Sequence, residues 1–395
     1  MSFLGSMGVV KVSILTVPDY DFQCIHEALE KSIELIGGLP DCIRAGARVF
    51  VKINHLPPAS PAERGIVTHP IFAEAVLRLI AGTGAHITVG DDIESSLGYE
   101  VSGYYEMCRR LGVNLVNLKE IGFRQIECKG RFLNKVYFSK AVLDADVVIN
   151  LPKLKTHSLT VITGGVKNMY GTIPSGFRTK LHGEYPDNED FAHVLADVFS
   201  VRIPELTIMD GIVAMEGEGP ASGRLKRLGL IIASRDAVAL DSVVAKIIGL
   251  KPMEVPTTRC CHERSLGIGT SERIEVVGQR IEDVVIVNFK YPLYVTSALA
   301  GKAPRFLLRY LLGQIGIRPR VIEDECTGCC ECERICPVYA ISMRNAIAWI
   351  EQSKCIGCLC CNEVCHFGAI ELKRPAIGRL LHLLYEMWRK FISRS

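Results

Sequence analysis

The stretch Cys326-Thr-Gly-Cys329-Cys-Glu-Cys332-Glu-Arg-Ile-Cys336-Pro337 is followed by a second run with the same spacing, Cys355-Ile-Gly-Cys358-Leu-Cys-Cys361-Asn-Glu-Val-Cys365-His366. Each run has the form C-x2-C-x2-C-x3-C, which is typical of thiolates that wrap a cubane iron–sulfur cluster. Three closely spaced cysteines on a tight loop can reach three corners of one cube. The helix that follows carries the fourth cysteine away, toward the other cluster. The sequence therefore predicts two [4Fe–4S] clusters.

This crossing of the fourth cysteines divides the eight predicted ligands into two sets. The first set is Cys326, Cys329, Cys332 and Cys365, and the second is Cys355, Cys358, Cys361 and Cys336. A zinc ribbon would need four ligands rather than a tandem eight. A disulfide framework is typical of small secreted domains and not of the end of a long chain. Cys330 and Cys360 have no ligand position, and the adjacency of Cys360 and Cys361 leaves the register of the second run open.

Residues 319–373 resemble bacterial-type two-cluster ferredoxins. Pro337 matches the proline that follows the fourth cysteine in that family. In the second run His366 stands at the equivalent position. The resemblance implies a small ferredoxin-like α+β module at the C-terminal end of the chain.

The totals describe a folded protein of 395 residues with 48% hydrophobic and 23% charged residues, which predicts two or three domains. The net charge of +3 gives no reason to expect specific nucleic-acid binding. Sixteen cysteines, eight of them outside the two ligand sets, indicate a reducing, cytoplasmic compartment. The N-terminus lacks the basic start of a signal peptide, and no apolar stretch reaches the ~18–20 residues of a spanning helix.

Residues 8–290 alternate between strand-like and helix-like patterns. Strands are expected at residues 8–17, 48–53, 86–89, 146–151, 206–209 and 228–233. Helices are expected at residues 22–37, from Pro70 to Gly82, and at residues 237–248 after the N-cap Asp236. This alternation predicts an α/β domain with a mostly parallel sheet and helices on both faces.

The predicted organisation has four parts. They are an α/β domain (1–288), a basic helical connector (289–318), the ferredoxin module (319–373) and a basic amphipathic helix (374–395). Leu380, Leu384 and Trp388 lie on the apolar stripe of the last helix. Such a helix either packs on the protein or on a second subunit, or lies on an anionic membrane surface, and both interpretations stay open.

In open parallel sheets, ligands bind beyond the carboxyl ends of the strands, so polar residues at those positions are candidates. Extended backbone would place Lys153, Lys155 and His157 on one side of the chain. The glycines before Lys167 could expose helix N–H groups to an anion. We predict catalytic roles in charge or proton handling for Lys153, Lys155, His157 and Asp210. We predict substrate-binding roles for Asn54, Asp91, Lys167 and Asn168, and an anionic small molecule as the ligand.

The loop after Asp210-Gly211, with Glu216 and Glu218, could hold a divalent metal through carboxylate oxygens or could be a solvated turn. The chain contains no P-loop. Its glycines at 217, 219 and 223 miss the dinucleotide-binding spacing, so NAD(P) is not expected.

Residues 10–275 resemble the domain-of-unknown-function 362 family. The resemblance rests on Val51-Lys-Ile-Asn54, Thr68-His69-Pro70 and Val89-Gly90-Asp91, and above all on Asn150-Leu-Pro-Lys-Leu-Lys-Thr-His157 with Thr163-Gly-Gly-Val-Lys-Asn168. Asp210-Gly211, Asp236 and Asp241 also fit. Members of that family are often fused to a two-cluster ferredoxin module. The resemblance implies the fold and the module order, and it supplies no substrate.

Three functions remain as hypotheses. The first is a ferredoxin-type oxidoreductase of anaerobic metabolism that passes electrons between the clusters and an anionic small molecule. In the second, the α/β domain docks a redox partner protein and the chain is an accessory subunit. In the third, the chain is a non-redox enzyme whose clusters are structural or act as sensors.

Overall fold

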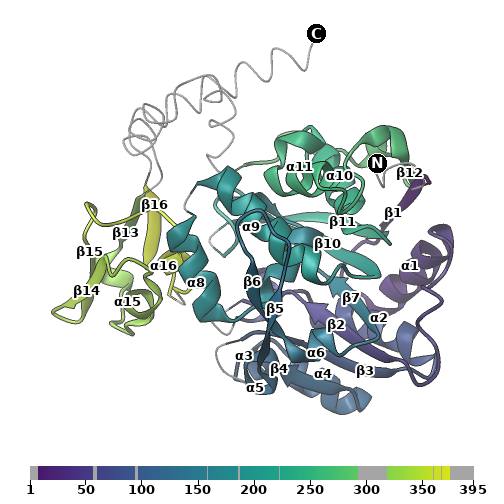
Figure 1. The fold of residues 1–395 in the computed structure, drawn as a ribbon, viewed down its shortest axis with the longest axis horizontal. Coiled ribbons are helices and arrows are strands. Elements are labelled where there is room, and N and C mark those ends of the chain that lie inside the picture. Colours follow the sequence, from purple (N-terminus) through teal and green to yellow (C-terminus); the bar gives the residue numbers. More distant parts are fainter. Residues whose placement is uncertain are drawn as a thin grey trace, which may run out of the picture.

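The computed structural model describes residues 8–56, 60–93, 97–157, 159–185, 187–221, 223–291, 318–358, 360–365 and 367–373. Most of the predicted connector, all of the predicted C-terminal helix and His366 lie outside these residues. The described chain forms a large α/β body, residues 8–291, and a smaller cysteine module, residues 318–373 (Figure 1). None of the described helices is long and apolar enough to cross a membrane.

The body is built on a ten-stranded sheet whose main path has the order β12-β1-β11-β10-β7-β2-β3-β4. Strands β8 and β9 extend the sheet beside β10. Its strands are β1 (Val10–Thr16), β2 (Arg48–Ile53), β3 (His86–Asp91), β4 (Asn114–Asn117), β7 (Val147–Leu151), β8 (Lys153–His157), β9 (Val161–Thr163), β10 (Leu206–Glu216), β11 (Arg224–Ser234) and β12 (Ile274–Gly278). A separate antiparallel pair is formed by β5 (Phe123–Glu127) and β6 (Lys135–Ser139). Most pairings in the main sheet are parallel, and those of β11 with β1 and β10 and of β8 with β9 are antiparallel.

The helices of the body connect these strands. The longer ones are α1 (Phe22–Leu35), α2 (Pro70–Ala81), α4 (Tyr104–Leu111), α8 (Ser175–Glu184), α9 (Asn188–Val201), α10 (Ala237–Ile247) and α11 (Pro256–Glu263). The short ones are α3 (Leu97–Val101), α5 (Leu118–Ile121), α6 (Lys140–Leu143), α7 (Gly165–Asn168), the 3-10 turn η3 (Met169–Thr172) and α12 (Ile281–Val284). Side chains start several of them: Asp21, His69 and Asp236 each accept a hydrogen bond from the first turn of α1, α2 and α10.

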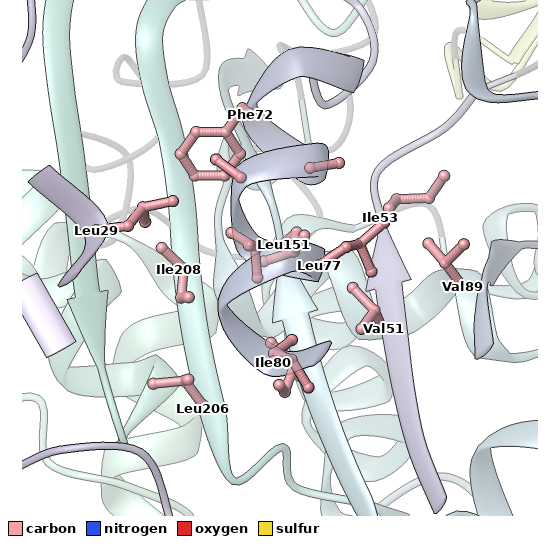
Figure 2. Close-up of a cluster of buried hydrophobic side chains, with 14 of the residues drawn as sticks. Leu29, Val51, Ile53, Phe72, Leu77, Ile80, Val89, Leu151, Leu206 and Ile208 are labelled. Carbon is pink, nitrogen blue, oxygen red and sulfur yellow. The ribbon is translucent and has the colours of Figure 1, made fainter. Parts of the chain in front are cut away.

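Both faces of the sheet are covered by helices, which confirms the predicted fold class. In β2, Val49, Val51 and Ile53 join the core beneath α1 and α2, whereas Phe50 joins the core beneath α9. This alternation follows from the two-residue period of a strand. Figure 2 shows the first of these cores, in which Phe72, Leu77 and Ile80 of α2 lie over strand residues such as Leu151.

The chain after Leu151 departs from the sequence prediction in two ways. Residues 153–157, which are not among the expected strands, form strand β8, which pairs in parallel with β10, with Lys153 opposite Asp210. The strand expected to end at Asp210 continues as β10 to Glu216 and turns back as the antiparallel strand β11. The apolar run ends at Met209, but pairing with β8 and β11 keeps the more polar continuation extended. Asp210 therefore lies inside a strand rather than after one.

The cysteine module contains two antiparallel pairs and two short helices. Its elements are β13 (Arg318–Val321), α15 (Glu331–Ile335), β14 (Ile341–Arg344), β15 (Ile347–Ile350), α16 (Cys360–Glu363) and β16 (Ile370–Lys373). Strand β13 pairs with β16 and β14 pairs with β15. The small core is formed by Ile341, Ile350 and Ile370 together with Cys332 and Cys361. Helix α8 of the body is the element that lies beside this module (Figure 1).

Candidate functional site: a basic cavity and two cysteine clusters

A small cavity of about 40 Å³ lies at the carboxyl ends of β2 and β3 and beside β8 and β9. Five of the eight predicted site residues of the body line it: Asn54, Asp91, Lys155, Lys167 and Asn168. The structure adds further lining residues: Lys52, His55, Leu56, Thr163, Tyr170, Gly171, Arg178 and Pro220. A space of this size takes a few waters or one small anionic group.

Four cations surround this cavity: Lys52, Lys155, Lys167 and Arg178. Lys52 is fully buried and its Nζ lies 2.8 Å from Asp91 Oδ1. Burial lowers the pKa of Lys52, and the Asp91 carboxylate opposes that shift. Arg178 of α8 donates to Asp92 Oδ2 over 2.7 Å. Lys155 and Lys167 also line the space, and the Nζ of Lys155 donates to the Ile66 carbonyl oxygen over 2.6 Å.

Gly171 lies close against the Lys52–Asp91 pair. A Cβ atom added at this position would lie 2.7 Å from Asp91 Oδ1 and 2.8 Å from Lys52 Nζ. Both distances are below van der Waals contact. The backbone of η3 therefore approaches the ion pair as only glycine allows.

A chain of amides fixes the orientation of Asn54. The carbonyl oxygen of Gly165 can only accept, so Asn150 must present its Nδ2 there, over 2.9 Å. Asn150 Oδ1 then accepts from Asn168 Nδ2 over 2.8 Å, and Asn168 Oδ1 accepts from Asn54 Nδ2 over 3.0 Å. Asn54 Oδ1 is left over, and no partner for it exists among the described residues.

Two other polar side chains of the lining also have a buried atom without a hydrogen bond. Within the described part of the chain, neither Thr163 Oγ1 nor His55 Nδ1 has a hydrogen-bond partner. Buried polar atoms are nearly always paired, with protein groups, water or a ligand. A cavity lined by four cations, two acceptor atoms and a hydroxyl is suited to an anion that also carries an O–H or N–H donor.

His55 is held as a neutral imidazole. Its Nε2 lies 3.2 Å from the Gly98 carbonyl oxygen and 3.0 Å from Ser102 Oγ, and Ser102 itself donates to the same carbonyl. These contacts require the proton on Nε2, which leaves Nδ1 as an acceptor. Burial, with Lys155 and Lys52 nearby, lowers the pKa of His55 to about 4. At neutral pH His55 is therefore an uncharged imidazole whose Nδ1 can accept a hydrogen bond.

We expect this histidine to make stability depend on pH. Because its folded-state pKa is about 4, below the ordinary 6.5, the unfolded chain takes up the proton first as the pH falls. The contribution of His55 is fully present above pH 6.5 and is lost between pH 6.5 and 4. At the acid end of this range, the free energy of unfolding is lower by roughly 3 kcal/mol for this reason. Urea unfolding of wild type and His55→Gln between pH 7.5 and 4.5 measures it.

The free energy of unfolding of His55→Gln should depend less on pH than that of wild type. His86→Gln is the matched control, since His86 is exposed at the start of β3. An unchanged profile in His55→Gln would show that His55 is not buried as the neutral form.

Lys153 and Asp210 lie outside the cavity and pair with each other. Lys153 Nζ is 2.8 Å from Asp210 Oδ2, and both side chains are buried. Asp210 also accepts from the Tyr20 hydroxyl over 2.8 Å, the His69 amide over 3.0 Å and the Ile212 amide over 3.2 Å. A carboxylate with these four donors is saturated. Through these hydrogen bonds Asp210 joins the segment after β1 and the start of α2 to β8 and β10. Because its oxygens are already engaged, Asp210 does not suit the predicted role in proton transfer.

The expected anion site at the start of α7 is already occupied by a side chain. Asp241 of α10 accepts from the Gly165 amide over 2.6 Å and the Val166 amide over 3.1 Å. Burial raises the pKa of Asp241 to about 7, although these two amides favour the carboxylate. The prediction for the helix start is therefore wrong, and Lys167 serves the cavity instead.

The other predicted site residues are engaged in local structure. His157 is fully buried, and its Nδ1 accepts from the Leu159 amide over 3.1 Å. Glu216 pairs with Lys226 over 3.0 Å at the β10–β11 turn. Among the described residues of the α/β body, no group of three or more His, Cys, Asp or Glu side chains is placed to hold a metal ion. The predicted divalent metal therefore has no visible site there.

In the cysteine module, two small cavities separate the cysteines into groups. One is lined by Cys326, Cys329, Cys332 and Cys365 together with Cys330, and the other by Cys336, Cys355, Cys358 and Cys361 together with Cys360. The fourth cysteine of each run thus lines the cavity of the other run. Burial and the neighbouring thiols Cys329 and Cys365 raise the pKa of Cys332 to about 11. Thiols gathered in this way become thiolates on metal binding.

Backbone amides point at three of these sulfurs. The Ala340 amide lies 3.2 Å from Cys336 Sγ, that of Ala369 3.2 Å from Cys365 Sγ, and that of Ala348 3.5 Å from Cys326 Sγ. Hydrogen bonds to the sulfurs are one of the means by which a protein tunes a cluster potential. The residues present therefore fit iron–sulfur clusters.

Residues 49–246 match the family described as Domain of unknown function (DUF362). This chain belongs to the DUF362 family. Residues 319–342 match the 4Fe-4S binding domain, so the protein is an iron–sulfur protein of that family. A thylakoid-associated protein of Synechocystis sp. is 33% identical over 289 residues, which are 72% of this chain and 88% of the relative.

Two solved structures are distantly similar. The lactate racemase apoprotein from Thermoanaerobacterium thermosaccharolyticum is 11% identical, with a TM-score of 0.41 over 58% of this chain and 55% of that one. A Thermotoga maritima protein is 14% identical, with a TM-score of 0.34 over 56% of this chain and 57% of that one. The chain thus spans little more than half of either structure.

The sequence reasoning missed several residues that line the cavity of this DUF362 protein. Lys52 is the next-to-last residue of β2. A lysine between the apolar residues of a predicted buried strand is unusual, and that signal could have found it. His55 directly follows β2, so the rule for polar residues after strands includes it, although it was assigned no role. Arg178 only adds positive charge downstream of the candidate residues, and Thr163 has no local signal; the packing of α8 and β9 brings them to the cavity.

Proposed function

We propose that this protein is a ferredoxin-type oxidoreductase. In it, electrons pass between two [4Fe–4S] clusters and an anionic small molecule bound in the basic cavity. The proposal keeps the four-part organisation of the chain, with boundaries at 288, 318 and 373. The observation that carries it is the convergence of Lys52, Lys155, Lys167 and Arg178 on one cavity with orphaned polar atoms.

The crosswise grouping of the cysteines supports two clusters. We assign one cluster to Cys326, Cys329, Cys332 and Cys365, and the other to Cys336, Cys355, Cys358 and Cys361. When bound, clusters of this kind supply one-electron transfer over a wide range of potentials. The C-x2-C spacing of Cys355 and Cys358 continues to Cys361 and not to Cys360. This favours Cys361 over Cys360 as the ligand.

The residues of the cavity divide into charge-holding and hydrogen-bonding groups. Lys155 and Lys167 stabilise the negative charge of the ligand, and Lys52 and Arg178 remain tied to Asp91 and Asp92. His55 replaces His157 and Asp210 in our assignment of the group that accepts the ligand's O–H or N–H in a hydrogen bond, because its Nδ1 is unprotonated at neutral pH. Asn54 and Thr163 orient the ligand through Oδ1 and Oγ1.

The thylakoid-associated relative supports a further part of the proposal. We place the protein in a reducing, cytoplasmic compartment, where it contacts a membrane surface without crossing it. The basic amphipathic helix predicted at residues 374–395 would supply that contact. Co-flotation of the full chain with anionic vesicles, and its loss when residues 374–395 are removed, would support the contact.

An anion titration tests the cavity. Phosphate and small organic acids should raise the unfolding temperature of the holo-protein, and Lys167→Met should abolish most of that shift, because a bound ligand stabilises only the state that holds it. Lys167 is only partly buried, so the substitution should leave the fold intact. Lys31→Met on the exposed side of α1 is the control. Equal shifts in wild type and Lys167→Met would refute the assignment.

A further inference from the structure

A second and much larger space separates the body from the cysteine module. It is a cleft of about 670 Å³ between α8 and the segment that follows α15. The body contributes Asp92, Lys119 and Lys180, and the module contributes Cys336 and the residues up to Tyr339. Small-molecule sites have volumes of roughly 300–1,000 Å³ and often lie between domains. The cleft therefore has the size and the place of a binding site.

The cleft has a fixed edge where the two parts of the protein touch. A Cβ atom added at Gly183 of α8 would lie 3.1 Å from Pro337 Cβ. Pro337 directly follows Cys336, which lines both the cleft and the cavity of Cys355, Cys358 and Cys361. Figure 1 shows α8 between the sheet of the body and the cysteine module. A ligand in the cleft would therefore lie against one of the assigned cluster ligands.

One buried atom in the cleft lacks a partner. Asp92 is 2% exposed, and its Oδ2 accepts from Arg178, but no group among the described residues is placed to hydrogen-bond its Oδ1. Burial raises the pKa of Asp92, whereas the Arg178 guanidinium and a hydrogen bond from the Ser175 amide oppose that shift. A buried carboxyl oxygen of this kind is completed by a donor from water or from a ligand.

The module side of the cleft is mainly apolar and ends in an exposed aromatic ring. Ile335, Pro337, Val338 and Val364 line it. Tyr339 is 86% exposed and has a φ of 51°, in the left-handed region that large side chains rarely adopt. A flat ring system would cover this surface and stack on Tyr339.

Cations stand at the rim of the same cleft. Lys180 lies 3.6 Å from Glu184, and Arg334 lies 2.6 Å from Glu331, and both cations are on the surface. Exposed ion pairs of this kind are weak and exchange readily for other partners. Lys119 is a third exposed cation in the lining. An anionic substituent of a ligand would be attracted here.

We propose that the cleft binds a planar conjugated anion, with its ring on Pro337 and Tyr339, an N–H or O–H donor at Asp92 and its charge near Lys119 and Lys180. This site is separate from the basic cavity, and the Arg178–Asp92 ion pair lies between the two. The inference does not depend on what the basic cavity binds.

Titration of the anaerobic holo-protein with flavin mononucleotide tests the proposal, since this probe has a planar ring, an N–H donor and a phosphate. Fluorescence quenching should give saturable binding. Riboflavin, which lacks the phosphate, should bind more weakly. Tyr339→Ala should weaken binding about tenfold, the loss expected of one aromatic stacking contact. Lys180→Ala should weaken it as well.

Two kinds of control keep the test decisive. Tyr105→Ala and Lys31→Ala remove an exposed tyrosine and an exposed lysine elsewhere, and they should bind as wild type does. Gly183→Val should push Pro337 away and weaken binding without loss of iron. Absence of saturable binding to the wild type, or equal binding by Tyr339→Ala, would overturn the proposal. Lys167→Met should not affect this binding, so failure here is distinguishable from failure of the basic cavity.

Discussion

Replacement of Asp210 by asparagine is expected to lower the free energy of unfolding by about 3–5 kcal/mol. The substitution leaves the Lys153 ammonium buried without its carboxylate, 2.8 Å away in the wild type. It also removes acceptor capacity for the Tyr20 hydroxyl and the His69 amide. Since whole domains are stable by only about 5–15 kcal/mol, this is a severe loss. Urea unfolding under anaerobic conditions measures it.

A double substitution separates the buried charge from the packing. Lys153→Met/Asp210→Leu removes both charges, and it should be less destabilised than Asp210→Asn alone. The control is Asp283→Asn, which breaks an exposed pair with Arg280 and should have a barely measurable effect. If Asp210→Asn proved as mild as Asp283→Asn, the pair would not be the buried anchor described above.

The crosswise cluster assignment predicts a non-additive pattern of iron loss. Wild type should hold about eight irons per chain, and Cys332→Ala or Cys365→Ala should each leave about four. Because both cysteines line one cavity, the Cys332→Ala/Cys365→Ala double variant should also keep about four. Cys332→Ala/Cys336→Ala affects both cavities and should leave almost none. Colorimetric iron determination on anaerobically prepared protein gives these numbers.

The spare cysteines supply the control for this experiment. Cys330→Ala and Cys360→Ala should retain the iron content of wild type, because neither is an assigned ligand. The assignment fails if Cys332→Ala/Cys365→Ala loses nearly all of its iron while Cys332→Ala/Cys336→Ala keeps half.

The sequence predicted the strands and helices whose apolar pattern is local. Strand β2 has the predicted bounds Arg48–Ile53, and Asp236 starts α10 as predicted. The rule that ligands gather at the carboxyl ends of parallel strands identified Asn54 and Asp91, and both line the basic cavity. These features depend on short stretches of chain and on one general property of α/β sheets.

The remaining features depend on contacts between distant segments. Lys153 and Asp210 appeared to be separate polar residues after strands, but their pairing across β8 and β10 joins them into a buried ion pair. Asp241 lies on an apolar helix, and only the packing of α10 against α7 brings it to the Gly165 amide. Arg178 reaches the cavity because α8 lies beside the end of β3. No pattern within one of these segments predicts which distant segment packs against it.

The content of the basic cavity tests the central claim most directly. Protein purified anaerobically is denatured, and the released small molecules are identified by mass spectrometry in wild type and Lys167→Met. We predict that wild type releases an anion with a carboxylate or phosphate group and at least one O–H or N–H, and that Lys167→Met releases much less of it. Release of no such anion by wild type, or of equal amounts by both proteins, would contradict the account.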